Sequence, residues 1–148
     1  MKENKRNDAR FAKTYLLKIR KTDQIIRRLT EVRFSLRSSL YSTGVPLSGM
    51  PGGSHDPDRT GKTIARLDEL ERRIDAYVDE LVARKSEAFL RIRRLPELSE
   101  QDVLIARYIQ LKPWPVIARE MHYSEQHIYR LHGIALQHFE APGEDESI

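Results

Sequence analysis

The feature that most limits the fold of this 148-residue sequence is a long stretch without helix-breaking residues. From Asp8 to Ser42 there is neither proline nor glycine, and apolar residues recur at alternating steps of three and four. This spacing places them along one side of an α-helix, with the rhythm of a helix that packs against a partner. We therefore predict one long amphipathic helix. Its expected inward-facing residues include Ile19, Ile26, Leu29 and Leu36.

A second stretch, from Arg59 to Leu95, repeats the same apolar rhythm, and its expected inward-facing residues include Ile74, Val78 and Leu81. We expect the two segments to fold back on each other as a long antiparallel helical hairpin over residues 1–95. In that arrangement Arg33 lies within one turn of Glu71, so that two charges in the seam neutralise each other. The connecting segment 43–58 is dense in Gly and Pro, which excludes regular structure. It is either disordered or functional, and its low apolar content favours disorder.

The remaining residues are predicted to form a small helical domain over 96–141, followed by a disordered acidic tail at 142–148. Pro96 ends the long helix. Ser99, followed three residues later by Asp102, resembles a helix-capping arrangement and predicts a helix that ends before Lys112. The fold class is therefore all-α, with a hairpin that resembles a coiled coil and a C-terminal domain.

The end of this domain has the layout of a helix-turn-helix. Ala118 is small where two helices would cross, and a tight turn is expected at His122-Tyr123-Ser124. Ser124 is placed to cap a second helix beginning at Glu125. His122 occupies the turn position that most often holds glycine, and histidine adopts a positive φ less easily. Helical spacing sorts the second helix into a buried stripe of Ile128, Leu131, Ala135 and Leu136.

Polar residues remain on the outer side of this second helix, near its N-terminal end, which is the end that a recognition helix points into the DNA major groove. They are Glu125, Gln126, His127, Tyr129 and Arg130. Arginine can bind guanine through two hydrogen bonds and glutamine can pair with adenine, whereas tyrosine and serine more often hold phosphate. The alternative is an ordinary pair of packed helices with solvated polar residues.

These residues carry a family resemblance. The segment resembles the C-terminal promoter-reading region of bacterial sigma factors and, more closely, the sigma-like phage regulators of the ArpU and RinA type. The residues that carry the resemblance are Ile117-Ala118, Met121, Tyr123-Ser124-Glu125, Ile128-Tyr129-Arg130-Leu131-His132 and Ala135-Leu136.

The resemblance implies a sequence-specific DNA-binding regulator that controls transcription of phage or prophage genes in the cytoplasm of a bacterial host. It assigns base reading to Glu125, Gln126, Tyr129 and Arg130, and contacts with the phosphate backbone to Ser124, Arg119, His127 and His132. Because sigma-like modules also touch RNA polymerase, the polymerase is a second expected partner beside double-stranded DNA.

Charge is distributed unevenly along the chain. Residues 1–42 carry twelve Lys and Arg against four acids, whereas residues 96–141 carry four against six. Since phosphate neutralisation supplies most non-specific DNA affinity, this suggests help from the N-terminal helix, from dimerisation or from a partner protein. The lack of cysteine excludes disulfides and Cys-based metal sites, and no apolar run is long enough for a membrane span.

No catalytic or metal-binding set stands out, so we expect no enzyme activity and no cofactor. The His residues at 122, 127, 132 and 138 are spaced to spread around a helix rather than to share one face. Two alternatives to a regulator remain: a DNA-packaging protein similar to a phage small terminase subunit, or a helical adaptor that binds RNA polymerase or a repressor. The width of the apolar stripes also predicts a homo-oligomer, most simply a dimer.

Overall fold

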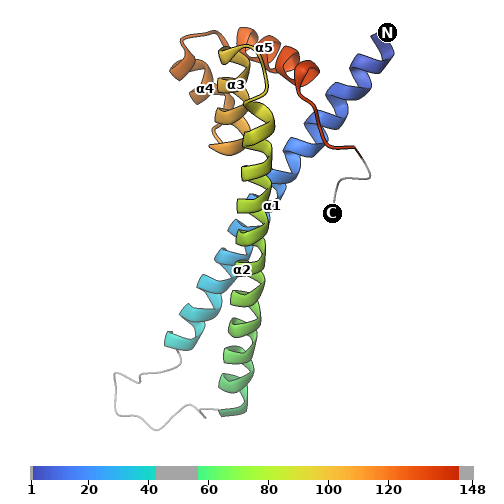
Figure 1. Ribbon diagram of the computed structural model, residues 1–148. Coiled ribbons are helices and arrows are strands. Elements are labelled where there is room, and N and C mark those ends of the chain that lie inside the picture. Colours follow the sequence, from blue (N-terminus) through green and yellow to red (C-terminus); the bar gives the residue numbers. More distant parts are fainter. Residues whose placement is uncertain (1, 43–56, 144–148) are drawn as a thin grey trace. The chain divides into compact units, whose positions relative to one another are not determined.

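The computed structural model describes residues 2–42 and 57–143, and of residues 2–7 only the backbone. All the regular structure in these ranges is helical, which confirms the predicted all-α class. Figure 1 shows the helices coloured along the chain, with α1 to α5 labelled. The regular elements also include a π-helix, η1. They are α1 (Lys2–Ser42), α2 (Pro57–Ile92), α3 (Leu98–Leu104), η1 (Ile105–Ile109), α4 (Trp114–Met121) and α5 (Glu125–His138).

The two long helices differ from the predicted ones at their ends. Helix α1 begins at Lys2 rather than near Asp8. Helix α2 begins at Pro57, where the fixed φ of proline suits a first turn. The negative charge of Asp58 in that turn interacts favourably with the positive N-terminal end of the helix dipole. The helix ends at Ile92 and passes into a turn before Pro96. Of the connecting segment 43–58, expected to lack regular structure, residues 43–56 lie outside the described residues, as do residues 144–148 of the expected acidic tail. Pro57 and Asp58 belong to α2, so the predicted end of this segment is wrong by two residues.

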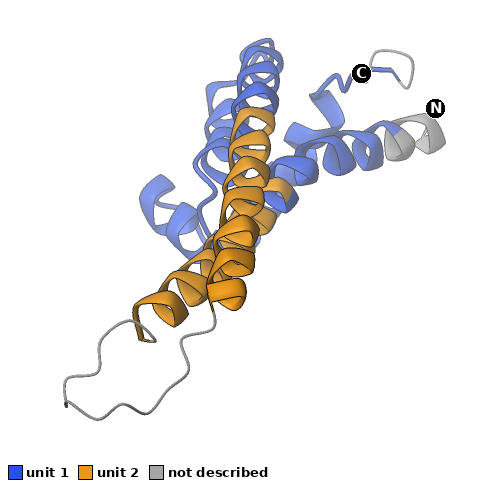
Figure 2. Ribbon diagram, turned by 90° about the horizontal axis from the view of Figure 1, so that it is seen from below, with its two compact units in different colours: residues 1–21, 81–148 blue, residues 22–80 orange. Residues whose placement is uncertain are grey.

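The chain divides into two compact units, and α1 and α2 contribute to both (Figure 2). Unit 2 comprises residues 22–80, in which the second part of α1 packs antiparallel to the first part of α2. Its buried residues are Thr22, Leu67, Leu70 and Ile74. Arg37 forms an ion pair with Glu71 across the two helices. The predicted hairpin is thus present in this unit.

Two details of the predicted seam are wrong. Val78, expected inside, is 40% exposed, and Tyr77 is turned inward instead. The inward series at 67, 70, 74, 77 and 81 keeps alternating steps of three and four, and Val78 lies one position beside it. Glu71 pairs with Arg37, one helical turn beyond the expected Arg33. Among the other predicted seam residues Ile19 and Ile74 are buried, and Ile26, Leu29, Leu36 and Leu81 are half-buried.

Unit 1 comprises residues 1–21 and 81–148 and is built around a single apolar core. Helix α1 contributes Ala12, Leu16 and Ile19, and α2 contributes Ala88 and Ile92. The shorter helices add the rest of the core, including Val103, Leu104, Tyr108, Ile117, Ile128, Ala135 and Leu136. The 96–141 segment, expected to form a domain of its own, therefore shares its core with the N-terminal part of α1.

The first short helix of this unit departs from its prediction. Helix α3 begins at Leu98, and Glu97 at its N-cap makes no side-chain capping bond. Ser99 therefore lies inside the helix and does not cap it. The helix then widens into η1, where the amide of Gln110 donates to the carbonyl of Ile105 at 2.9 Å. Leu111, with φ 58°, ends the segment and directs the chain toward α4.

Candidate nucleic-acid interface

The turn between α4 and α5 has the predicted geometry. His122 adopts the left-handed conformation, with φ 58° and ψ 39°, and ends α4. The amide of Tyr123 then donates to the carbonyl of Ala118 at 3.0 Å. Ser124 is extended, and its hydroxyl accepts a hydrogen bond from the amide of His127 at 3.2 Å. The predicted turn, the N-cap at Ser124 and the start of α5 at Glu125 are confirmed.

Helix α5 has a buried and an exposed side. Ile128 and Ala135 are fully buried, Leu136 is nearly so, and Leu131 is half-buried. The four residues expected to read bases, Glu125, Gln126, Tyr129 and Arg130, are all exposed. Because Gln126, Tyr129 and Arg130 are three or four positions apart, they share one face of the helix. The phosphate candidates Arg119, Ser124 and His127 are exposed at the same end of α5 or on α4.

His132 is the exception among the predicted contact residues. Its side chain is buried, with 8% of the residue exposed, and its Nε2 lies 2.8 Å from the hydroxyl of Tyr108 in a hydrogen bond. Burial, with smaller contributions from the charges of Lys13 and Arg107, lowers the pKa of His132 to about 4. A neutral imidazole inside the core does not reach a phosphate group, so the expected phosphate contact of His132 is wrong.

The ring of Trp114 packs against two residues of α5, His132 and Tyr129. It lies edge-on to His132, with centroids 4.7 Å apart, and edge-on to Tyr129, with centroids 5.2 Å apart. The guanidinium of Arg107 lies over the Trp114 ring at 4.3 Å, a cation–π contact. Tyr129, which is 48% exposed, is therefore held on one side by a tryptophan. Trp114, itself half-buried, is therefore a packing residue between His132 and Tyr129.

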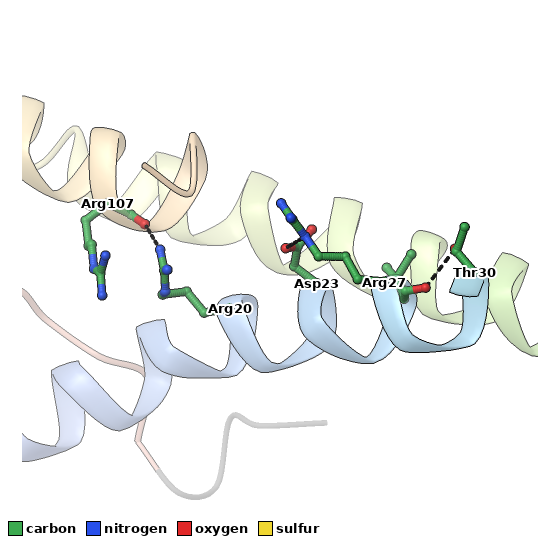
Figure 3. A network of polar contacts seen from close by, with 6 residues as sticks. Arg20, Asp23, Arg27, Thr30 and Arg107 are labelled. Atoms are coloured by element: carbon green, nitrogen blue, oxygen red, sulfur yellow. Dashed lines mark hydrogen bonds and ion pairs between the residues drawn. The ribbon is translucent and has the colours of Figure 1, made fainter. Parts of the chain in front are cut away.

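Arg107 was not identified from the sequence, although it connects three elements. Its carbonyl accepts a hydrogen bond from Nη1 of Arg20 in α1 at 2.9 Å (Figure 3), and its own Nη1 donates to the carbonyl of Lys112 at 3.1 Å. Burial, and next the charge of Arg20, lower the pKa of Arg107. The sequence gives no signal for this role, because it depends on the π-helical turn that aims the side chain at Trp114.

Two further contacts lie at the two ends of α5. At its start the rings of Tyr123 and His127 lie 4.4 Å apart, so the turn and the first helical turn present one exposed aromatic pair. At its end Nδ1 of His138 lies 3.0 and 2.9 Å from the two carboxylate oxygens of the buried Glu100 in α3. The contact of His138 with Glu100 joins the end of α5 to α3, whereas the Tyr123–His127 pair is local to the turn and the start of α5.

Over the described ranges, no group of three or more His, Asp or Glu side chains is arranged to hold a metal ion. None of the described helices is both long enough and apolar enough to cross a membrane. No protein-family model, no curated protein and no solved structure matches this chain.

Proposed function

We propose that this protein binds double-stranded DNA by placing the N-terminal half of α5 in the major groove, and that it regulates transcription of phage or prophage genes. The observation that carries the proposal is the two-sided character of α5. One side is sealed into the core by Ile128 and Ala135, while Gln126, Tyr129 and Arg130 form an exposed row at the capped end. Recognition helices present their N-terminal residues to base edges in this way.

The side chains of this face suit base reading. Arg130 can donate two parallel hydrogen bonds to guanine, and the amide of Gln126 can pair with adenine. Glu125 can accept from the amino group of cytosine. Tyr129 belongs to the same face, and its ring packs edge-on with Trp114. Arg119, Ser124 and His127 flank this row and can hold the adjacent phosphates, which fixes register rather than sequence.

The transcriptional role rests on the resemblance to sigma-like phage regulators, which also brings in RNA polymerase as a partner and a bacterial cytoplasm as the location. The same exposed face could serve an adaptor that binds only protein. These two functions differ in whether the chain prefers one DNA sequence over another.

The test is DNA binding by the full chain to duplexes from its own genomic neighbourhood, with non-specific competitor present. Replacing Arg130 by Ala should remove the sequence preference, at about 1 to 3 kcal/mol for a base contact. Arg130→Lys keeps the charge but not the planar fork, so it should lose preference while keeping most non-specific affinity. Arg66→Ala, at an exposed arginine of α2, is the control and should change neither.

If Arg130→Ala binds every duplex as the wild type does, α5 does not read bases. The adaptor would then be the better assignment. An equal loss of affinity for all duplexes in Arg130→Ala, restored in Arg130→Lys, would make Arg130 a phosphate contact rather than a reader of guanine.

A homodimer is part of the proposal and is supported by apolar residues that unit 2 leaves in solvent. These residues are Ile25, Val32, Phe34, Tyr41, Ile64 and Val78. Exposed apolar surface in a two-helix hairpin is stabilised by burial against another chain. Sedimentation equilibrium should give twice the chain mass, and a Val32→Glu, Phe34→Glu variant should shift it toward the monomer. A monomeric wild type at micromolar concentration would contradict the dimer.

A further inference from the structure

The exposed face of α5 has few cations of its own. Of the cations in residues 96–143, Arg107 is stacked on Trp114 and Lys112 is paired with Glu120 at 2.7 Å. Arg119 and Arg130 remain exposed, as does the acidic Glu125. Because contacts with phosphate supply most of the sequence-independent affinity for DNA, a second source of positive charge is needed.

The first part of α1 is fixed against the helices that carry this face. Ala12 and Leu16 are fully buried in the same core as Ile128. The ring of Tyr15 stacks on Phe139, just beyond α5, with centroids 5.8 Å apart. The hydrogen bond from Arg20 to the carbonyl of Arg107, drawn in Figure 3, joins α1 to η1. This part of α1 is therefore a packed member of unit 1, and its outer side has a defined position.

That outer side is cationic. Arg10, Lys13 and Lys21 are exposed, and their positions at i, i+3 and i+11 bring them onto one face of the helix. Asp8 is the only acid in residues 8–21. None of the three cations forms an ion pair with another residue of the described ranges. Eleven residues of α-helix span about 16 Å, a length over which a DNA strand presents several phosphates.

The cationic face formed by Arg10, Lys13 and Lys21 belongs to a helix that packs against the C-terminal end of α5 through Tyr15 and Phe139. The charge of Lys13 is close enough to His132 to contribute, after burial, to the lowering of its pKa. The ring of His132 contacts Trp114, and Trp114 contacts the exposed Tyr129. Lys13 thus lies within electrostatic range of His132, whose ring is linked through Trp114 to Tyr129 of the exposed row.

The geometry points to a second DNA contact in which the cationic face of α1 binds the phosphate backbone beside the groove that α5 enters. This inference rests on the proposed function, because it takes duplex DNA as the ligand. It assigns the two tasks to different helices: α5 selects the sequence, and α1 supplies the affinity that depends on salt.

The test compares two variants of the full chain that remove the same charge. One carries Arg10→Gln, Lys13→Gln and Lys21→Gln. The control carries Arg59→Gln, Arg66→Gln and Arg72→Gln, at exposed positions of α2 in unit 2. Affinity for a duplex of arbitrary sequence is measured from low to moderate NaCl. Since each lost phosphate contact reduces the slope of log affinity against log salt by about 0.9, the α1 variant should lose about 3 from the slope, and the control should keep it.

Circular dichroism should show the same thermal transition for both variants, because all six side chains are exposed. An unchanged slope in the α1 variant, or an equal loss in the control, would overturn the inference. So would a wild-type chain that binds no duplex at low salt.

The outcome for α5 is separate from the outcome for α1. If the salt slope falls in the α1 variant while Arg130→Ala leaves sequence preference unchanged, phosphate binding by α1 is supported and base reading by α5 is refuted. If Arg130→Ala removes the preference while the α1 variant keeps its slope, the proposed function stands and the contact through α1 fails.

Discussion

The hydroxyl of Tyr108 and Nε2 of His132 form a buried hydrogen bond of 2.8 Å that joins η1 to α5. Tyr108 comes from η1, and His132, which was expected to contact the phosphate backbone, comes from α5. Their pairing satisfies two polar groups inside the core of unit 1, where an unpaired one would be costly.

Tyr108→Phe removes one partner of this pair and leaves the imidazole of His132 buried without it. We expect the free energy of unfolding to fall by about 1 to 3 kcal/mol, the usual cost of a buried polar group that loses its hydrogen bond. Urea denaturation of the full chain measures the change. Tyr129→Phe is the matched control: Tyr129 is half-exposed, so the change should stay within about 0.5 kcal/mol. Equal losses would show that the buried pair has no special role.

The lowered pKa of His132 predicts that the stability of the chain depends on pH. This pKa falls from the ordinary 6.5 to about 4 in the folded chain. Between these values the unfolded chain binds more protons than the folded one, so stability is full above pH 6.5 and is lost as pH falls toward 4. A shift of this size corresponds to about 3 kcal/mol at the acid end of the window.

The measurement for this second prediction is chemical denaturation at several pH values between 4 and 7. His132→Gln has no group that titrates there, so it should lose the part of the pH dependence that comes from His132. If the slope of the unfolding free energy against pH is the same in His132→Gln as in the wild type, another group is titrating.

Ser124→Ala tests the N-cap of α5. The hydroxyl of Ser124 accepts from the amide of His127 at 3.2 Å, and its loss should cost about 1 kcal/mol of stability. Ser99→Ala is the control, because α3 starts before Ser99 and Glu97 at its N-cap makes no capping bond. Thermal unfolding should therefore show a lower midpoint for Ser124→Ala alone. A comparable drop in Ser99→Ala would contradict the assignment of the cap.

The parts that could be predicted from the sequence are those set by local interactions. The turn at His122 and the cap at Ser124 depend on a few neighbouring residues, and the buried stripe of α5 depends on helical spacing. All three are present in the structure. The exposed side of α5 follows from the same spacing, which is why Gln126, Tyr129 and Arg130 were placed correctly.

The parts that were missed depend on packing between distant segments. The burial of His132 requires Tyr108 and Trp114, which approach it only in the folded chain. The π-helix has no local signal comparable to a cap or a glycine, and the residues it buries in the core, Ala106 and Tyr108, lie within its turn from Ile105 to Gln110. Val78 was misplaced because Val78 and Tyr77 are both apolar neighbours, and only packing in unit 2 decides which of them turns inward.

Within residues 2–42 and 57–143, the two residues with positive φ offer the last prediction. His122 and Leu111 share φ 58°, a conformation that costs an L-residue about 1 to 2 kcal/mol and that glycine adopts freely. His122 is exposed, so His122→Gly should raise the free energy of unfolding by about 1 kcal/mol, the relief being partly offset by the greater freedom of glycine in the unfolded chain.

Leu111 is half-buried against the core of unit 1, so glycine there relieves the same backbone strain but removes apolar contacts. Losing most of a leucine side chain costs about 2 to 5 kcal/mol when it is fully buried and less here, so Leu111→Gly should lower stability overall. Urea denaturation of the two variants should therefore give changes of opposite sign. A gain at both positions would mean that Leu111 contributes little packing, and a loss at both would mean that the histidine at 122 makes contacts that outweigh its strained backbone.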